Sequence, residues 1–408
     1  MGEILFLSHR IPFPPDRGDK IRSHHVLKAL AGLAPVHVAT FCDDEQDRAF
    51  EGDLASLAAS YRLVERSKPL HVAGLQALAS GRPLSLTAFH DKDLEAYVRD
   101  LLVERDIDTV YVFSGQMAQY VPVDFRGRVV ADLVDVDSAK FEAYGARGLG
   151  FRSWMERREG RLLRREEARI CSGAAVTLLI SGAEVGLLRS RLNGDEGRVR
   201  AMGNGLDAAY FDPDLILPEK QMVAMGAPRI VFTGQMDYAP NIEAATRAID
   251  RILPLVRRIC PQATLHIVGR NPPAALQSRS GRDGVKVWGR VDDIRPWLAA
   301  ADVALVPLEI ARGVQNKVLE AMAMGLPVVL SPGAATGIDA FDGRDFAIRD
   351  GDAAMAQAIL DLARAPETAK LMGHDARAWI VANASWEAAF ARLPEYLGIM
   401  GEVLPDVA

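Results

Sequence analysis

Cysteines and long apolar runs are scarce in this chain of 408 residues. Its 3 cysteines, Cys42, Cys171 and Cys260, are odd in number and have no close spacing. Such usage fits a reducing cytoplasm and excludes both a disulfide framework and a zinc site. No window approaches 18 uncharged apolar residues, so the sequence predicts no membrane-spanning helix.

Basic charge is not in excess either. Lys and Arg total 48 against 54 Asp and Glu, for a net charge of -6. This balance argues against a dedicated nucleic-acid-binding protein but leaves a local basic patch open. The start, Met1-Gly2-Glu3, lacks the basic region of a signal peptide, and Phe6 stands where a myristoylation motif requires Ser or Thr. We therefore expect a cytoplasmic protein, at most peripheral at the inner membrane.

Three common motifs are missing. The sequence contains no Gly-x4-Gly-Lys-Ser/Thr phosphate loop and no Gly-x-Ser-x-Gly nucleophile elbow. Gly203-Asn204-Gly205 lacks the third glycine that a dinucleotide fingerprint requires. Neither a phosphate-loop NTPase nor a serine hydrolase is therefore expected.

What the chain does have is an alternation of short apolar runs with longer amphipathic segments. Apolar residues make up 49% and charged residues 25%, the balance of an ordinary globular protein with room for two or three domains. Runs of four to six apolar residues between helices are typical of buried parallel strands in an α/β protein. The expected strands are 4–8, 36–41, 62–65, 109–113, 129–134, 176–180 and 199–202, then 230–233, 264–268, 285–288, 303–307, 328–331 and 346–348. The expected helices include 20–33, 91–104, 151–171, 242–259 and 317–324.

The series of strands is interrupted once. Residues 212–229 hold Pro213, Pro218 and Pro228 and no periodic segment, which is typical of a linker. The sequence thus predicts two doubly wound, Rossmann-like domains, 1–210 and 211–383, facing a cleft. A helix over 386–397, about 384–400 at its widest, is expected to pack back on the first domain.

Residues 304–329 carry the most informative pattern. A buried strand ends at Pro307, a polar loop follows, and a helix begins near Gln315. The free N–H groups and positive dipole end of such a helix favour an anion, and Arg312 and Lys317 add charges that suit a diphosphate. Glu320, one turn into the helix, can accept hydrogen bonds from ribose hydroxyls. A solvated loop with a helix-face glutamate is the alternative.

Residues 316–329, Asn-Lys-Val-Leu-Glu-Ala-Met-Ala-Met-Gly-Leu-Pro-Val-Val, resemble the nucleotide-sugar motif of family-4 retaining glycosyltransferases, which have the two-domain GT-B fold. Other segments resemble the family in the same order along the chain: 203–213, 231–234, 265–269, 287–291 and 302–307. The stretches 7–22 and 134–138 resemble the sugar transferases associated with exosortase (PEP-CTERM) exopolysaccharide systems.

The resemblance implies a donor domain in 211–383 and an acceptor domain in 1–210. In the donor domain, Lys317 and Arg312 would act on the diphosphate and Glu320 on the ribose. The other residues implied at the donor are Gly234, Gly289, Arg290, Val291, Gly313, Val314, Gln315 and Asn316. The base would be paired by backbone near 289–291. No cofactor is expected beyond the nucleotide-diphosphate sugar itself, a UDP- or GDP-linked substrate.

This sequence departs from the family at two places. Arg312 stands where the first glutamate of the family's E-x7-E pair belongs, and Glu309 lies three residues too early. The cations that usually clamp the diphosphate are replaced by Gln235 and the uncharged neighbourhood of Asn241. We infer that Arg312 and Lys317 take over this charge.

The first loop, residues 12–25, supplies Arg17, Gly18, Lys20 and Arg22 after the first strand. Glycine permits a close approach of backbone to a ligand, and the resemblance places this loop against the donor phosphates and the acceptor. Lys20 and Arg22 are expected to join Arg17 in a basic cleft. An exposed basic turn is the alternative.

Asp135 and Asp137 follow the strand 129–134 and are candidates for catalytic groups that orient the acceptor or contact the sugar. Capping of the next helix by Asp137 is the alternative, and a metal site is not expected. The helix 151–171 carries seven arginines and four glutamates. Such a pattern is typical of a solvated helix, with a peripheral membrane face as the second interpretation.

The resemblance therefore predicts a retaining glycosyltransferase of exopolysaccharide biosynthesis, acting on a glycan or polyprenyl-diphosphate-linked acceptor. Two alternatives stay open. One is a nucleotide-sugar enzyme without transfer, such as a 2-epimerase. The other is a catalytically silent relative that binds a nucleotide or glycan and supports a partner enzyme.

Overall fold

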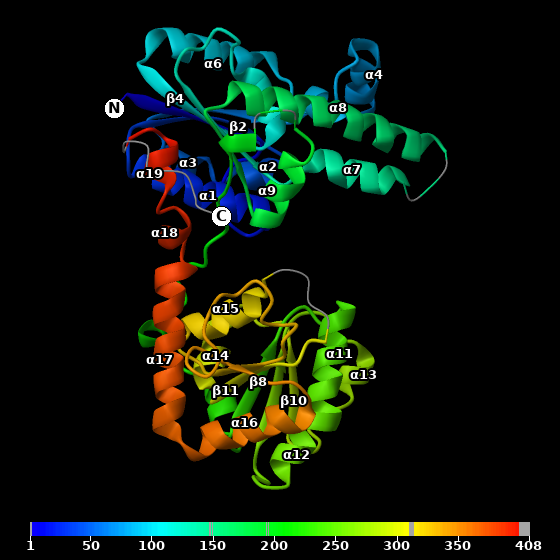
Figure 1. Cartoon of the computed structure of the whole chain (residues 1–408), viewed down its shortest axis with the longest axis vertical. Helices are drawn as coiled ribbons and strands as arrows, with labels where there is room; N and C mark the ends of the chain where they lie inside the picture. The colour runs from blue at the N-terminus through cyan, green and yellow to red at the C-terminus, as the bar shows by residue number, and fades with distance from the viewer. Residues whose placement is uncertain are drawn as a thin grey trace. The chain divides into compact units, whose positions relative to one another are not determined.

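The structure, a computed structural model, describes residues 2–146, 148, 150–192, 194, 196–309 and 314–399 (Figure 1). It divides into two compact units. The first runs to Asn204 and takes in the chain from Ala389 onward, and the second is Gly205–Ala388. Within the described residues, no helix combines the length and apolar character needed to cross a membrane.

The first unit is built on a seven-stranded parallel sheet of order β3-β2-β1-β4-β5-β6-β7. Its strands are β1 (Glu3–Ser8), β2 (Val36–Cys42), β3 (Ser60–Glu65), β4 (Ile107–Phe113), β5 (Arg128–Val134), β6 (Val176–Leu179) and β7 (Val199–Ala201). Its α-helices are α1 (Gly18–Ala31), α2 (Glu45–Arg48), α3 (Glu51–Leu57), α4 (Leu70–Ser80), α5 (Leu84–Ala88), α6 (Lys92–Glu104), α7 (Asp137–Ala146), α8 (Phe151–Gly173) and α9 (Gly182–Arg189). The 3₁₀ turns η1 (Gly115–Tyr120) and η2 (Glu196–Arg198) complete it.

The composition of the central strands agrees with their burial in a parallel sheet. The central strands β1, β2 and β4 are mainly apolar and are buried along almost their whole length, as is typical of strands covered by helices on both faces. Helix α6 covers one face and α1 the other (Figure 1). The chain order places the topological switch point between β1 and β4, where ligands of doubly wound sheets bind.

The second unit has a six-stranded parallel sheet of order β10-β9-β8-β11-β12-β13. Its strands are β8 (Arg229–Thr233), β9 (Thr264–Val268), β10 (Val285–Gly289), β11 (Val303–Val306), β12 (Val328–Leu330) and β13 (Ala347–Ile348). Its helices are η3 (Pro213–Leu215), α10 (Lys220–Val223), α11 (Ala239–Arg247), the π-helical η4 (Ala248–Ile252), α12 (Leu253–Arg257), α13 (Ala274–Gln277), α14 (Arg295–Ala300), α15 (Asn316–Ala323), α16 (Asp352–Arg364) and α17 (Pro366–Asn383). The switch point lies between β8 and β11.

The C-terminal helix predicted over 386–397 is not continuous. Two short helices, α18 (Trp386–Ala389) and α19 (Leu393–Tyr396), replace it. Pro394 stands at the start of α19, and it has no N–H to donate to the preceding turn, which explains the break. Arg128 of β5 donates to the Tyr396 carbonyl at 2.7 Å and so ties α19 to the first unit's sheet.

Candidate functional site

The backbone of two loops forms a glycine floor at the carboxyl edge of the second sheet, where the loop after β8 borders the switch point. The loops after β8 and β9 lie against each other, with Gly234 N–H donating to the Val268 carbonyl at 3.1 Å and Met236 N–H to the Arg270 carbonyl at 2.8 Å. A Cβ atom on Gly269 would lie 1.6 Å from the Gly234 oxygen. Glycine is therefore required at 269, since any side chain would force the two loops apart.

The replacement Gly269→Ala is expected to destabilise the second unit by about 3 kcal/mol, because the methyl group overlaps the Gly234 carbonyl and one loop must shift. Calorimetric unfolding measures the effect. Gly52→Ala is the matched control, because a Cβ atom at Gly52 meets nothing within 4 Å. Equal stability of the two variants would show that the loops separate without cost.

Lys317, in the first turn of α15, reaches over this floor. Its Nζ atom donates to Asn241 Oδ1 and lies 4.8 Å from the centre of the Phe232 ring. A Cβ atom on Gly234 would lie 3.0 Å from the same Nζ. Asn241 is held in turn by its own bond to the Gln235 carbonyl at 2.8 Å. The loop after β8 has no cation of its own at Gln235 or Asn241, and the structure places the Lys317 ammonium there.

Burial sets the electrostatics of this corner. It lowers the pKa of Lys317 to about 8, against the opposing attraction of Glu320. Burial also raises the pKa of Glu320, and Lys317 opposes that change. An ammonium that has lost hydration without gaining a strong partner is favourably placed to bind an anion, because the anion would restore its charge stabilisation.

The first turn of α15 offers further donors. The helix begins at Asn316 after Gln315, and no hydrogen bond from the side chain of Gln315 caps it in the structure described. Val314 lies exposed just before it and would touch a Cβ atom on Gly337 at 3.1 Å. Arg312 and Gly313, predicted next to this turn, lie outside the described residues.

The residues predicted at the base lie at the end of β10, on the same edge of the sheet. Gly289 has a φ of 75°, and its carbonyl accepts from Gly269 N–H at 2.9 Å. Arg290 is exposed, and Val291 packs partly against the core. The structure thus brings Gly234, Gly289, Lys317 and the start of α15 to one edge.

Arg247 was not predicted, yet it supports this edge. Its guanidinium donates to Asp352 at 2.6 Å and to the Pro307 carbonyl at 3.1 Å, at the end of β11. Glu309 lies 4.0 Å from the same group and is largely exposed. The sequence showed that Arg247 is a basic residue inside the predicted helix 242–259. Nothing in the sequence indicates that Arg247 contacts Asp352.

The prediction that Lys20 and Arg22 line a basic cleft is wrong. Both are buried, with exposed fractions of 3% and 1%. Lys20 pairs with Asp47 at 2.5 Å, and Arg22 pairs with Asp132 at 3.0 Å. The single acid inside the apolar strand β5 was the signal in the sequence, because a buried carboxylate requires a cationic partner. These cations stabilise the first unit and are not available to a ligand.

Arg17 and Gly18 do lie at the carboxyl end of β1. Arg17, with 48% of its side chain exposed, stands 3.5 Å from both Asp19 and Asp43. Helix α1 starts at Gly18, where an added Cβ atom would meet nothing within 4 Å. Gly18 is therefore not required by crowding within the chain.

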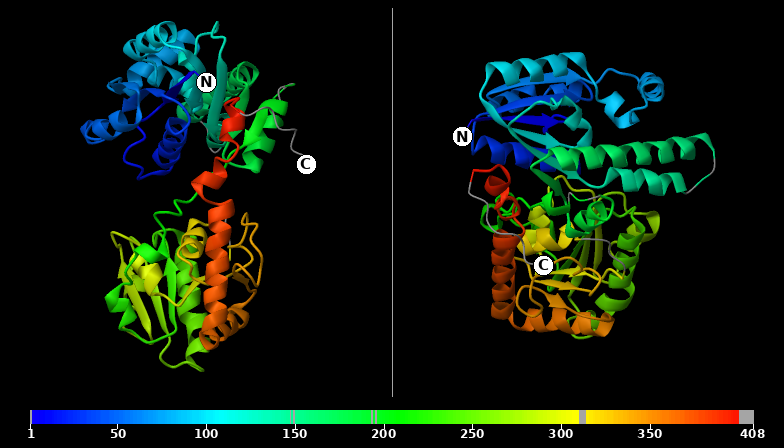
Figure 2. Two further views of the ribbon diagram at one scale, coloured as in Figure 1. Left: turned by 90° about the vertical axis from the view of Figure 1, so that its left-hand side faces the viewer. Right: turned by 45° about the horizontal axis from the view of Figure 1, so that its top comes forward.

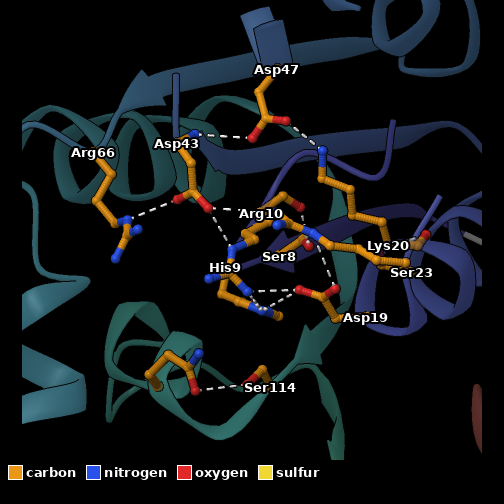
Figure 3. Close-up of polar contacts among 12 residues, drawn as sticks. Ser8, His9, Arg10, Asp19, Lys20, Ser23, Asp43, Asp47, Arg66 and Ser114 are labelled. Carbon is orange, nitrogen blue, oxygen red and sulfur yellow. Dashed lines mark hydrogen bonds and ion pairs between the residues drawn. The ribbon is translucent and has the colours of Figure 1, made fainter. Parts of the chain in front are cut away.

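A network of ion pairs follows β1 (Figure 3). Arg10 donates to Asp19 and Asp43, both at 2.7 Å, and Arg66 donates to Asp43 at 2.8 Å. His9 lies 3.4 Å from Asp19 and stacks on the Phe113 ring. These contacts hold the pKa of Asp19 well below its usual range, against the opposing effect of burial. The sequence interpretation did not include this network.

Asp135 and Asp137 follow β5 and share one cation. The Lys140 ammonium lies 2.7 Å from Asp135 and 3.3 Å from Asp137. Helix α7 starts at Asp137, but the carboxylate that accepts from its first turn is Glu167, bonded to Ser138 N–H at 2.9 Å. Glu167, and not Asp137, thus accepts from Ser138 N–H, and the role of Asp137 toward a substrate stays a prediction.

Comparison with known proteins agrees with this geometry. Residues 227–365 match the family described as Glycosyl transferases group 1. No curated protein matches the sequence. Among solved structures, HepE of Anabaena in complex with UDP and glucose superposes with a TM-score of 0.58 at 16% identity, covering 98% of this chain and 100% of that one.

Two further structures are similar over the same length. Sucrose-phosphate synthase from Thermosynechococcus elongatus gives a TM-score of 0.56 at 17% identity, covering 97% of this chain and 98% of its own. WaaG, a glycosyltransferase involved in lipopolysaccharide biosynthesis, gives 0.54 at 15%, covering 97% and 100%. The predicted GT-B fold is confirmed. Residues 227–365 match the group 1 glycosyl transferase family, in agreement with the enzyme class predicted from the sequence.

Proposed function

We propose that the protein is a retaining glycosyltransferase that transfers a sugar from a UDP- or GDP-linked donor. The observation that carries the proposal is the Lys317 ammonium, half-buried over the glycine floor at the switch point of the group 1 domain. HepE structures with UDP and with UDP-glucose support a uridine donor.

In this proposal the diphosphate lies against the first turn of α15. Lys317 and the N–H groups of that turn stabilise the negative charge that develops on the leaving diphosphate. Glu320, one turn further along α15, accepts hydrogen bonds from the ribose hydroxyls. Backbone groups near 289–291 pair with the base.

Retention of configuration follows from the resemblance to family-4 enzymes. In that family the leaving phosphate oxygen is thought to remove the acceptor proton on the same face of the sugar, so no protein nucleophile is required. Arg17 with Gly18 and the pair Asp135 and Asp137 are then groups for the donor phosphates and the acceptor. The proposed acceptor is a glycan or polyprenyl-diphosphate-linked chain of an exosortase-associated exopolysaccharide system, at the inner face of the membrane.

Thermal-shift measurements with UDP, GDP, ADP and dTDP sugars test the donor. A stabilising nucleotide sugar is then supplied with a polyprenyl-diphosphate-linked glycan, and the anomeric configuration of the product is read by NMR coupling constants. Retained configuration supports the proposal, and inversion contradicts it. An epimer or free nucleotide from donor alone would favour the 2-epimerase alternative, and binding without any turnover would favour a silent relative.

Donor affinity is expected to fall as the pH rises through about 8. Lys317 must be protonated to attract the diphosphate, and its pKa in the free protein is about 8. Bound diphosphate raises that pKa, so affinity is constant at lower pH and then declines by up to tenfold per pH unit. Calorimetric titration with a UDP-sugar, whose diphosphate stays fully ionised, measures the profile. Lys317→Arg keeps its charge throughout and should abolish the decline; a decline that persists in this variant would assign it to another group.

A further inference from the structure

Helix α17 lies beside α15 in the second unit (Figures 1 and 2). Arg377 of α17 donates through Nη1 to the Ala323 carbonyl at 2.6 Å and to the Phe211 carbonyl at 2.7 Å. Its Nη2 atom lies 3.3 Å from the Asp212 carboxylate. Because the donors of a guanidinium have a fixed planar arrangement, these contacts define how the three segments lie against one another.

The bond to Ala323 completes the end of α15. The carbonyls of Glu320, Ala321 and Met322 accept from backbone N–H groups that follow them in the chain, at 3.0 to 3.1 Å. Ala323 is the last residue of the helix, and its carbonyl accepts from Arg377. The last turn of α15 contains no basic residue of its own. Arg377 therefore supplies, from another helix, both a donor and the cation that a helix C-terminus favours.

A second contact between the two helices lies one turn earlier along α17. A Cβ atom on Gly373 would lie 1.9 Å from the oxygen of Gly325, two residues past the end of α15. Gly373 and Arg377 are four positions apart and so lie on the same side of α17. The backbone of α17 thus touches the chain just beyond α15, and the Arg377 side chain holds its last turn.

The bonds at the two ends of α15 decide where the helix lies along its axis. It has 8 residues, which at about 1.5 Å per residue gives a length of about 12 Å. Its buried side chains pack on the core, but apolar contacts have no preferred direction. At the first turn the polar bond joins Lys317 to Asn241, and at the last turn it joins Ala323 to Arg377.

Arg377 also holds the segment by which the chain enters the second unit, Gly205–Ala388. Near the start of this unit, Leu206 N–H donates to the Ala384 carbonyl at 2.7 Å, and Trp386 N–H donates to the Leu206 carbonyl at 3.3 Å. The entering and leaving segments are therefore paired, directly before the residues that accept from Arg377 and directly after α17. The guanidinium ties α15 to this paired segment.

We propose that Arg377 is a positioning residue for the donor, which holds the last turn of α15 so that Lys317, at the first turn, stays over the glycine floor. The ammonium has little freedom there, since a Cβ atom on Gly234 would lie 3.0 Å from it. A shift of α15 by about 1 Å is enough to weaken binding of a diphosphate. This inference rests on the proposed function, because it assigns donor binding to α15.

Arg377→Met removes every donor but keeps an apolar stem, and it tests the proposal. We expect the Kd of the donor nucleotide sugar, measured by calorimetric titration at neutral pH, to rise about tenfold or more. NMR titration of protein labelled with ¹³C at lysine Cε is the second measurement, with Lys317 assigned by its absence from Lys317→Met. The pKa of Lys317, which burial lowers to about 8, should rise toward the ordinary lysine value, because a displaced ammonium regains water. Glu320, the charged group that acts on this pKa, is unchanged in the variant.

Arg229→Met is the matched control in the same unit. Arg229 has 20% of its side chain exposed, against 24% for Arg377. It donates to both oxygens of Asp302, at 3.0 Å and 2.7 Å, from the start of β8 and thus from the edge of the sheet opposite to the donor residues. Its loss should lower the unfolding temperature but leave the donor Kd and the Lys317 titration unchanged.

A folded Arg377→Met protein with the wild-type Kd and the wild-type Lys317 titration would overturn the proposal. So would equal changes in Arg229→Met, because lost stability alone would then explain them. If Arg377→Met does not fold, Arg377→Gln takes its place, with the same expected changes and the same contradicting result. A wild-type protein that binds no nucleotide sugar would sink the proposed function, and the lysine titration would still decide whether Arg377 sets the position of α15.

Discussion

Replacement of Lys317 by methionine is expected to lower kcat/KM for sugar transfer by about 10²–10³-fold, the effect of removing one preorganised donor to a developing anion. Methionine keeps the length of the side chain and its contact with Phe232 but removes the ammonium that lies over Gly234. Initial rates at several donor concentrations separate loss of binding from loss of turnover.

The thermal stability of the Lys317→Met variant should not fall with its activity. The pKa of Lys317 is lowered to about 8, so the folded state disfavours its charge at every pH below the ordinary lysine pKa. That penalty is fully present below pH 8 and is lost as the pH rises toward the unfolded value. The methionine variant at neutral pH should therefore unfold at the same temperature as wild type or above it.

Lys370→Met is the matched control, because Lys370 is an exposed lysine of the same unit that lies 3.3 Å from the exposed carboxylate of Glu367. Its rates and unfolding temperature should equal those of wild type. Transfer by Lys317→Met within about threefold of wild type would remove Lys317 from the proposed chemistry. A fall in unfolding temperature would instead make Lys317 a stabilising residue.

The fold could be predicted because its signals are local. The central parallel strands, buried on both faces, are short and mainly apolar runs such as 4–8 or 303–306. The order of these segments along the chain resembles that of GT-B enzymes, and this resemblance predicted the GT-B fold. The start of α15 was predictable for the same reason, since a strand, a polar loop and a helix follow one another in the sequence.

The arrangement of the site was less predictable because it depends on contacts between distant segments. Lys317 was expected at the diphosphate, but its contact with Asn241, 76 positions earlier, is a product of the fold. The uncharged, mainly apolar sequence of α4 is typical of a buried helix, and only the structure shows that its leucines are exposed. Lys20 and Arg22 were predicted to line a basic cleft, and that position is wrong. A cation that faces a ligand and a cation in a buried ion pair have the same sequence pattern.

Arg22→Met is expected to destabilise the first unit by about 3–5 kcal/mol, because it leaves Asp132 buried without a counter-charge. Asp132 is 0% exposed and accepts from Arg22 through both of its oxygens, at 3.0 Å and 3.2 Å. Arg22 also donates to the Gly203 carbonyl at 3.0 Å, which joins β5 to the end of the unit. Calorimetric unfolding should show a fall of roughly 10 °C in the transition of this unit.

Two further variants decide whether the loss comes from the buried pair. Combining Arg22→Met with Asp132→Asn removes the uncompensated charge but keeps an acceptor for the Tyr111 hydroxyl, 2.9 Å from Asp132, so the double variant should be more stable than Arg22→Met alone. Arg17→Met, at the exposed arginine of the same loop, should leave the unfolding temperature unchanged and affect only transfer. If Arg22→Met kept full stability and lost transfer, Arg22 would belong to the ligand after all, and the buried pair would be dispensable for folding. If the double variant were no more stable than the single, the cost would arise from the lost bond to Gly203, and the charge of Asp132 would be tolerated by its bonds to Tyr111 and Val134.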